Sequence, residues 1–220
     1  MFKYLSIIKK FFNHYFSFNE NAYNYFFNLK VNINKINFFL KLKNFKDKNS
    51  FIWDGDWDKQ KIKITKYRKY NINYNSMFQI YKEKINFKKS DEYKFKLQQI
   101  KSGKNTARGK TINQLDDYFA SLNNLKNSLK KRGYLSQSQL SSVRKNDEIG
   151  VVIGRNGEII KIEDKFGGTH RFAICKIFKI NHIIVNVKAI HKSLINTDEL
   201  KKILVNKDKK KLEDKIKKKL

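Results

Sequence analysis

Residues 165–178, KFGGTHRFAICKIF, have the residue types of an anion-binding site. Gly167 and Gly168 stand side by side in a chain with only nine glycines, and Thr169, His170 and Arg171 follow directly. Glycine lets backbone amides approach a ligand closely and permits positive φ angles. A hydroxyl, an imidazole and a guanidinium can all donate hydrogen bonds to a phosphate or a carboxylate. This combination favours a cradle for such a group.

The apolar residues that follow predict a helix beginning at this cradle, because they lie mostly on one helical face: Phe172, Cys175, Ile177 and Phe178. The first turn of a helix offers unpaired N–H groups and the positive end of the helix dipole, and both favour an anion. A structural interpretation fits the spacing equally well. In it the glycines form a turn, Thr169 caps the helix, and His170 and Arg171 pair with Glu163 or Asp164.

The segment WDGDWD brings three carboxylates together, those of Asp54, Asp56 and Asp58. In an extended chain they would share one face, whereas Gly55 would permit a turn. Such a group suits Mg²⁺ binding, a general base or salt bridges to Lys and Arg, and the two tryptophans suit the core.

Two further positions in the sequence carry titratable side chains that could act at the cradle. Asp147 and Glu148 precede a β-rich run and are either acids at the entry of a strand or partners of His170 or Arg171. His191 ends the last predicted strand, where it either reaches the start of the helix or has a structural role.

The helix before these strands has clear boundaries. Thr111 and Gln114 form a capping box, and Gly133 is a typical stop. Between them runs one apolar stripe: Leu115, Tyr118, Phe119, Leu122, Leu125 and Leu129. Ser136 and Gln139 repeat the capping pattern and predict a short helix with Leu140 and Val143.

The next segment predicts a hairpin, the helix and a returning strand within residues 147–192. Residues 149–153 and 158–162 are β-rich and flank Asn156-Gly157, a sequence typical of tight hairpin turns. Residues 183–189 alternate as a strand does. Residues 28–42 are ambiguous between strand and helix, and the lysine-rich residues 198–220 predict a solvated helix or a frayed end.

Composition sets the remaining limits. The net charge of +29 attracts nucleic acid, anionic lipid or phosphorylated ligands, but the chain has few arginines and its Lys, Asn, Ile, Phe and Tyr content is typical of AT-rich coding. Nucleic acid is therefore the less favoured partner. The single Cys175 excludes an intramolecular disulfide and fits a buried thiol. With no apolar run of about 20 residues, we expect a cytoplasmic protein without a membrane span.

The hairpin, GGTHR, the helix and the returning strand resemble the core of the ParB/sulfiredoxin superfamily. More narrowly, the chain resembles an uncharacterised ParB-like branch over about residues 28–192. Its motifs correspond here to GDWD at 55–58, RGYLSQSQL at 132–140, DEI at 147–149, His170-Arg171 and Ile190-His191.

The resemblance implies that nucleotide phosphates bind at Gly167–Arg171, and the superfamily includes a free-serine kinase. This chain has Thr169 where sulfiredoxin has its catalytic cysteine, which excludes sulfinic-acid reduction of that form. The arginine pair of ParB and a helix-turn-helix after residue 192 are both missing, so partition of DNA is poorly supported.

These observations predict an α+β fold with a ParB/sulfiredoxin-like core and added N-terminal and middle helices. We expect an aromatic-rich helical extension at 1–50, a domain at 51–192 with a helical insertion at about 111–145, and a basic tail at 193–220.

The predicted ligand is ATP or another nucleotide with Mg²⁺, or a different anionic small molecule, bound by Gly167, Gly168, Thr169, His170 and Arg171. In a small-molecule kinase or ATPase, the catalytic groups would be Asp56, Asp58 and His170. Two alternatives remain: a non-catalytic binding module of a cell-surface carbohydrate pathway, and a DNA-binding protein.

Overall fold

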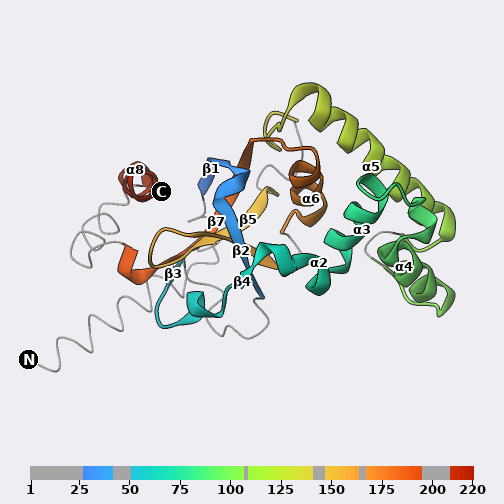
Figure 1. Cartoon of the computed structure of the whole chain (residues 1–220), viewed down its shortest axis with the longest axis horizontal. Coiled ribbons are helices and arrows are strands. Elements are labelled where there is room, and N and C mark those ends of the chain that lie inside the picture. The colour runs from blue at the N-terminus through green and yellow to red at the C-terminus, as the bar shows by residue number, and fades with distance from the viewer. Residues whose placement is uncertain (1–26, 42–50, 107–108, 141–146, 164–166, 195–208) are drawn as a thin grey trace, which may run out of the picture.

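The structure, a computed structural model, describes residues 27–41, 51–106, 109–140, 147–163, 167–194 and 209–220. Its fold is α+β: one mixed β-sheet with most of the described helices gathered to one side (Figure 1). None of the helices in these ranges combines the length and the apolarity needed to cross a bilayer.

Seven strands form the sheet: β1 (Phe27–Asn32), β2 (Ile36–Lys41), β3 (Ile52–Trp53), β4 (Ile62–Lys63), β5 (Ile149–Ile153), β6 (Ile159–Glu163) and β7 (His182–His191). Their order is β1-β7-β5-β6-β2-β4, and β3 also pairs with β7. The β5–β7, β2–β6 and β3–β7 pairs are parallel, and the other pairs are antiparallel. β5 and β7 are therefore central, and both are almost entirely buried.

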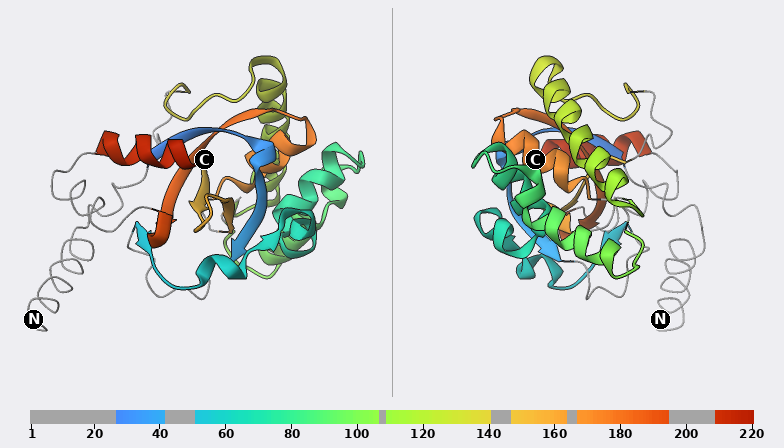
Figure 2. Two further views of the ribbon diagram at one scale, coloured as in Figure 1. Left: turned by 60° about the vertical axis from the view of Figure 1, so that its left-hand side comes forward. Right: turned by 90° about the vertical axis from the view of Figure 1, so that its right-hand side faces the viewer.

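The described α-helices are α2 (Tyr67–Tyr70), α3 (Ile72–Tyr81), α4 (Asp91–Lys101), α5 (Ile112–Arg132), α6 (Thr169–Ile177) and α8 (Lys209–Lys219). Helices α3 to α6 lie together, whereas α8 lies apart from them beside β1 (Figures 1 and 2). Short 3₁₀ turns connect several elements: Ile33–Lys35, Trp57–Gln60, Ile64–Lys66, Phe87–Lys89 and Lys192–Leu194.

Apolar side chains from both faces of the sheet are buried. The larger cluster joins the sheet to the helices and includes Phe39, Leu115, Phe119, Val185 and Phe172. A smaller cluster contains Trp53 and Trp57 with Leu40, Val152, Ile160, Ile162 and Ala189. Both tryptophans therefore belong to the core, as the sequence predicted.

The predicted boundaries of the long helix are confirmed. The Thr111 side chain accepts a hydrogen bond from the Gln114 amide at 3.2 Å, and Gly133 ends α5 with a φ of +70°. Ser136 and Gln139 likewise form the predicted reciprocal cap, with Gln139 N–H donating to Ser136 Oγ and Gln139 Oε1 accepting from the Ser136 amide. Residues 137–140 form a turn and not a helix, and residues 141–146 lie outside the described ranges.

The hairpin, helix and strand within residues 147–192 are confirmed as β5, β6, α6 and β7. Asn156 and Gly157 lie in the loop between β5 and β6, where the Gly154 amide donates to the Glu158 carbonyl. This loop is longer than a two-residue turn, and its extra length matters below because it includes Arg155.

Three expectations need correction. Residues 27–41 do not form part of the predicted helical extension: apart from the 3₁₀ turn at Ile33–Lys35 they form β1 and β2, which pair with β7 and β6. Helices α3 and α4 were not predicted from the sequence. Helix α8 is more than a solvated tail, because Ile216 is buried in the larger cluster and the Lys35 ammonium donates to the Leu220 carbonyl at 2.7 Å.

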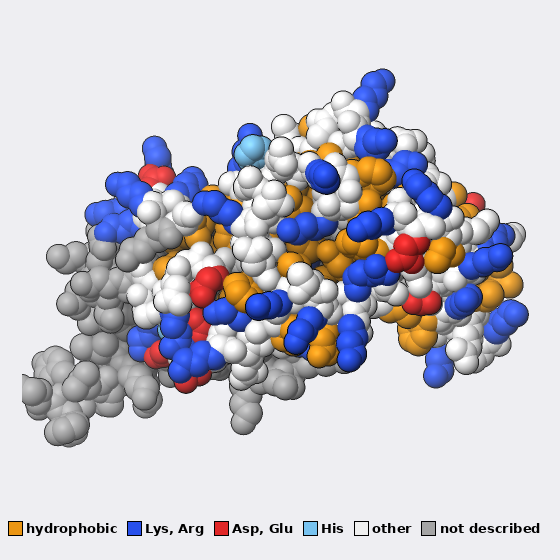
Figure 3. All heavy atoms as spheres, viewed as in Figure 1, with side chains coloured by type: hydrophobic (Ala, Val, Ile, Leu, Met, Phe, Trp, Pro, Cys, Tyr) orange, Lys and Arg blue, Asp and Glu red, His pale blue; other side chains and the backbone are white. Residues whose placement is uncertain are grey.

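Positive charge covers much of the surface on the side seen in Figure 3, with Lys and Arg side chains spread over the sheet and the helices. Expectations for residues 1–26 and 195–208 fall outside the described ranges.

The contact of α6 with β5 generates a stability prediction. Gly168 has a φ of +60°, and a Cβ there would lie 3.1 Å from the Ile149 Cα. Gly103 also has a positive φ, of +73°, but a Cβ there would meet open space. We expect Gly168→Ala to cost about 1–3 kcal/mol more than Gly103→Ala, because only the former overpacks the core. Urea denaturation of the two variants measures this difference, and equal losses would contradict it.

Candidate functional site

The glycine pair allows α6 to begin directly against the start of β5. Gly168 adopts the left-handed conformation (φ +60°, ψ +35°) at the N-cap of α6, and no described side chain caps the helix. Gly150 of β5 contributes to the close fit, since a Cβ there would lie 3.7 Å from the Gly167 Cα and 2.9 Å from the Ile162 Cδ1. Packing alone therefore requires small residues here, whether or not a ligand binds.

The His170 side chain points into the helical layer. Its Nε2 lies 2.7 Å from the Glu92 Oε2, and its Nδ1 lies 3.3 Å from the Tyr118 hydroxyl. Glu92 is fully buried on α4, and Tyr118 lies on α5. The imidazole thus ties α6 to two other helices. Its predicted role as a ligand or catalytic group is not supported by this geometry.

The Arg171 side chain belongs to a second buried network. Its guanidinium donates to the Asp147 carbonyl and to Glu148 Oε2, the latter at 3.4 Å. Glu148 is fully buried, and it also accepts from the Tyr134 hydroxyl and the Gln137 amide, each at 2.6 Å. Burial raises the pKa of Tyr134, and the nearby Glu148 carboxylate raises it further. The Tyr134 phenol therefore stays protonated and acts as a hydrogen-bond donor.

The acid pair Asp147-Glu148 is therefore the partner of Arg171, one of the two alternatives that the sequence left open. Arg171 is not paired with Glu163: its salt bridges in the described ranges are to Asp147 and Glu148, and Asp164 lies outside those ranges. The buried networks of Arg171 and His170 contain residues from three motifs of the resemblance: RGYLSQSQL, DEI and His170-Arg171.

Other groups face the start of α6. Tyr67 of α2 is fully buried, and its hydroxyl has no hydrogen-bond partner of normal geometry in the described part of the chain. Burial raises its pKa, and the nearby Thr169 side chain opposes that change. Tyr67 packs on Phe39 with ring centroids 4.5 Å apart, and Phe39 is directly opposite Lys161 in the sheet. Lys161 is fully buried, and its ammonium donates to the Ile162 carbonyl.

The WDGDWD acids lie in a different network, around Arg155 of the hairpin loop. Asp58 is 1% exposed and accepts from the Arg155 Nε, Nη2 and backbone N–H at 2.7–3.1 Å. Arg155 Nη2 also donates to Asp56 Oδ1 at 2.7 Å. His191 Nε2 lies 2.8 Å from the Gly55 carbonyl and 4.0 Å from Asp58 Oδ1. Burial works against ionisation of Asp58, but the Arg155 hydrogen bonds prevail and lower its pKa to about 2.

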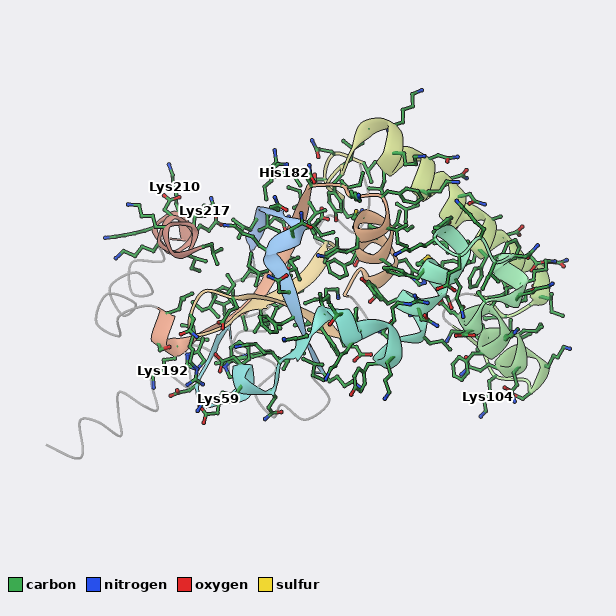
Figure 4. All side chains as sticks on the ribbon, in the orientation of Figure 1. Lys59, Lys104, His182, Lys192, Lys210 and Lys217 are labelled. Atoms are coloured by element: carbon green, nitrogen blue, oxygen red, sulfur yellow. The ribbon has the colours of Figure 1, made fainter. Side chains whose placement is uncertain are left out.

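The two networks lie at opposite ends of β5, so Asp56 and Asp58 do not join His170 in the one catalytic group that the sequence predicted. Gly168 contacts Ile149, the first residue of β5, whereas Asp58 lies beside Gly154, just after its last residue. A strand of this length spans roughly 16 Å at about 3.3 Å per residue. Lys59 and Lys192, which pair with Asp56 and Asp54, lie at this far end of the sheet (Figure 4).

The catalytic roles predicted for Asp56 and Asp58 therefore lose their geometric basis at the cradle. His191 does not reach the start of α6 but holds the turn at Gly55. Within the described ranges, no three His, Cys, Asp or Glu side chains form a group that could hold a metal ion.

The sequence missed the partners that matter most: Glu92, Tyr67, Lys161 and Arg155. One signal was present, because Lys161 interrupts the apolar run IIKIE at a position that faces the core. The other three gave no local signal.

Comparisons with family models, curated proteins and solved structures find no match to this chain. The ParB/sulfiredoxin resemblance therefore stays a prediction.

Removing Arg171 should destabilise the protein itself. Arg171→Ala leaves the Glu148 carboxylate buried without its cation, which typically costs about 3–5 kcal/mol. Arg132→Ala, which removes an exposed guanidinium, is the matched control and should change stability by about 0.5 kcal/mol or less. Urea denaturation measures both. Adding Glu148→Gln to Arg171→Ala should recover part of the loss, and no recovery would contradict the charge argument.

The lowered pKa of Asp58 predicts a dependence of stability on pH. Because its folded-state pKa is about 2 and the unfolded value is about 3.9, the contribution is complete above about pH 5 and is lost as the pH falls toward 2. The stability difference between the native protein and Asp58→Asn should therefore shrink over this range. Asp117→Asn, at an exposed site of α5, serves as the control. A difference that stays constant with pH would contradict the assignment.

Proposed function

We propose that the protein binds a phosphorylated small molecule, with a nucleotide as the leading candidate, at the start of α6. The observation that carries this proposal is the Tyr67 hydroxyl, which is buried beside the Thr169 side chain and makes no hydrogen bond of normal geometry in the described part of the chain. A buried polar group left without a hydrogen bond costs about 1–3 kcal/mol, so a ligand that accepts one relieves that cost.

The helix adds favourable electrostatics. Because no described side chain caps α6, the N–H groups of its first turn are open to an acceptor. The dipole of a helix is equivalent to about half a positive charge at this end. Thr169, which is half-buried at the first position of α6, supplies a hydroxyl between these amides and Tyr67.

Two charged groups of β6 lie near this end of the helix. Lys161 and Glu163 are on the same face of the strand. Glu163 accepts a hydrogen bond from the Asn71 side chain at 3.1 Å, and its negative charge helps to raise the pKa of Tyr67. The buried ammonium favours an anion, and the carboxylate disfavours one unless a cation accompanies it. This charge pair is consistent with a nucleotide bound with Mg²⁺, held by its phosphates and by Glu163 rather than by a protein cage.

The ligand set differs from the one that the sequence predicted. Thr169 and the backbone of Gly167 and Gly168 keep their roles, while His170 and Arg171 hold α6 in place through Glu92 and Glu148. The choice of a nucleotide rests on the resemblance to ParB-like proteins. We propose binding without assigning a phosphoryl transfer, so a binding module fits the site as well as a kinase or ATPase does.

Tyr67→Phe tests the proposal. In a thermal-shift panel of nucleotides, pyrophosphate and phosphate, with and without Mg²⁺, the native protein should be stabilised by at least one member, by about 2.7 kcal/mol at 100 times Kd. Tyr67→Phe should weaken that ligand by about 10- to 100-fold, since a hydrogen bond to a charged group contributes about 1.5–3 kcal/mol. The unliganded variant should be as stable as the native protein, because the hydroxyl has no described partner.

Tyr81→Phe, which removes a phenol oxygen at the far end of α3, is the matched control and should bind as the native protein does. If Tyr67→Phe instead destabilises the unliganded protein and leaves the ligand response unchanged, the hydroxyl is structural and the proposal fails.

A further inference from the structure

Acidic residues are missing from two long stretches of the sequence. Residues 118–146 and 165–197 contain no Asp or Glu. They include most of α5 and the whole of α6 and β7. Lysines on these elements therefore depend on acids from elsewhere in the chain for any salt bridge.

Four lysines from three helical segments lie over aromatic rings of the helical layer. Lys126 and Lys130 of α5 place their ammonium groups 5.6 Å from the Tyr81 ring centre and 5.3 Å from the Phe178 ring centre. Lys176 of α6 lies over Phe172, and Lys82, which follows α3, lies over Phe78, each at 5.9 Å.

The rings form two sets, one of Tyr81 and Phe178 and the other of Phe78, Tyr74 and Phe172. Tyr81 contacts Phe178, Phe78 contacts Tyr74, and Tyr74 contacts Phe172, with centroids 5.0–6.0 Å apart. Lys82, Lys126, Lys130 and Lys176 are called the lysine face below. Figure 3 shows Lys and Arg side chains over hydrophobic ones where α3, α5 and α6 face the viewer.

The charge of the lysine face is not balanced by acids. None of the four lysines forms a salt bridge to a described residue, whereas Lys59, Lys61, Lys88 and Lys192 each do. Glu83, the acid nearest along the chain to Lys82, is paired with Arg68 at 2.6 Å. Burial without a counter-ion lowers the pKa of Lys176.

Helix dipoles explain part of this arrangement but not all of it. Lys82, Lys130 and Lys176 lie at or next to the last turns of α3, α5 and α6, where the dipoles favour cations. Three helix ends amount to about −1.5 charges together, at half a charge each. The four ammonium groups exceed that, so a net positive surface remains.

We propose that the lysine face binds the phosphodiester backbone of a nucleic acid without sequence preference. Lysine supplies a point charge for phosphate, whereas base reading relies mostly on forked side chains such as Arg, Asn and Gln. The aromatic rings lie beneath the ammonium groups, so they are poorly placed to insert into a bilayer, which disfavours a lipid surface. This surface is independent of the site proposed at the other end of α6.

A charge-matched pair of variants tests this proposal. One replaces Lys82, Lys126, Lys130 and Lys176 by Gln, and the other replaces Lys94, Lys101, Lys104 and Lys110, which are exposed around α4 and pair with no described acid. Lys104 marks that region at the lower right of Figure 4. Both variants lose the same net charge. Fluorescence anisotropy with a 20-nucleotide single strand and a 20-base-pair duplex, in DNA and RNA forms, gives Kd over a range of salt concentrations.

The native protein should bind with log Kd rising linearly with log salt, and the lysine-face variant should reduce that slope by about three to four. Its affinity at 0.15 M salt should fall at least tenfold, while the α4 variant stays within about threefold of the native protein. Tyr67→Phe should bind like the native protein. A double variant, Lys126→Gln with Lys130→Gln, changes α5 alone and can be used if the fourfold variant does not fold. It should reduce the salt slope by about half as much as the fourfold variant does.

Equal losses in the two charge-matched variants would show that net charge alone attracts the nucleic acid, and would overturn the lysine face. Unchanged binding by the lysine-face variant would do the same. A third outcome would assign the face to a lipid surface instead. In it the native protein binds vesicles with 25% phosphatidylserine but no nucleic acid, and the lysine-face variant no longer binds the vesicles.

Discussion

The burial of Glu148 is the constraint on which the rest of this fold depends. A carboxylate with no exposed surface at the start of a central strand needs a cation and several donors, or it would be too costly to bury. Arg171 supplies the charge, and Tyr134 and the Gln137 amide supply hydrogen bonds. These groups come from α6 and from the segment after α5, and Glu148 directly precedes β5. Satisfying one carboxylate therefore fixes how these segments meet.

The same constraint explains why the most conspicuous motif of the sequence is not simply a ligand site. His170 and Arg171 are polar residues at the start of a helix, where a ligand would be expected, but each is turned toward a buried acid. Gly168 is required by its positive φ and by Ile149, whose Cα would lie only 3.1 Å from a Cβ at this position. What remains for a ligand is the backbone of the first turn, the Thr169 hydroxyl and Tyr67. A motif that looks chemical can thus be mainly architectural and still leave a binding site at its edge.

Sequence reasoning succeeded where local signals decide the structure and failed where distant pairs do. The cap at Thr111, the stop at Gly133 and the turn at Asn156-Gly157 are local, and all three were predicted correctly. The pairs His170–Glu92 and Arg155–Asp58 join residues 78 and 97 positions apart, and no pattern in a single sequence specifies them.

The missed helices are a different case, because their signals existed. Buried Tyr74, Met77 and Tyr81 follow helical spacing in α3, as do Tyr93, Leu97 and Ile100 in α4. The many Asn and Lys residues between them weakened the pattern.

The distribution of acids links the stability of the fold to its surface chemistry. The chain has 20 acidic residues against 49 basic ones, and three of the acids, Glu92, Glu148 and Asp58, are buried in the networks that hold the sheet and helices together. Each acid used inside is unavailable to neutralise a lysine outside. Acids are missing from most of the layer of α5 and α6: α5 has none after Asp117, and α6 has none at all. Self-repulsion on that side is therefore built into the fold, and a bound polyanion is the kind of partner that would relieve it.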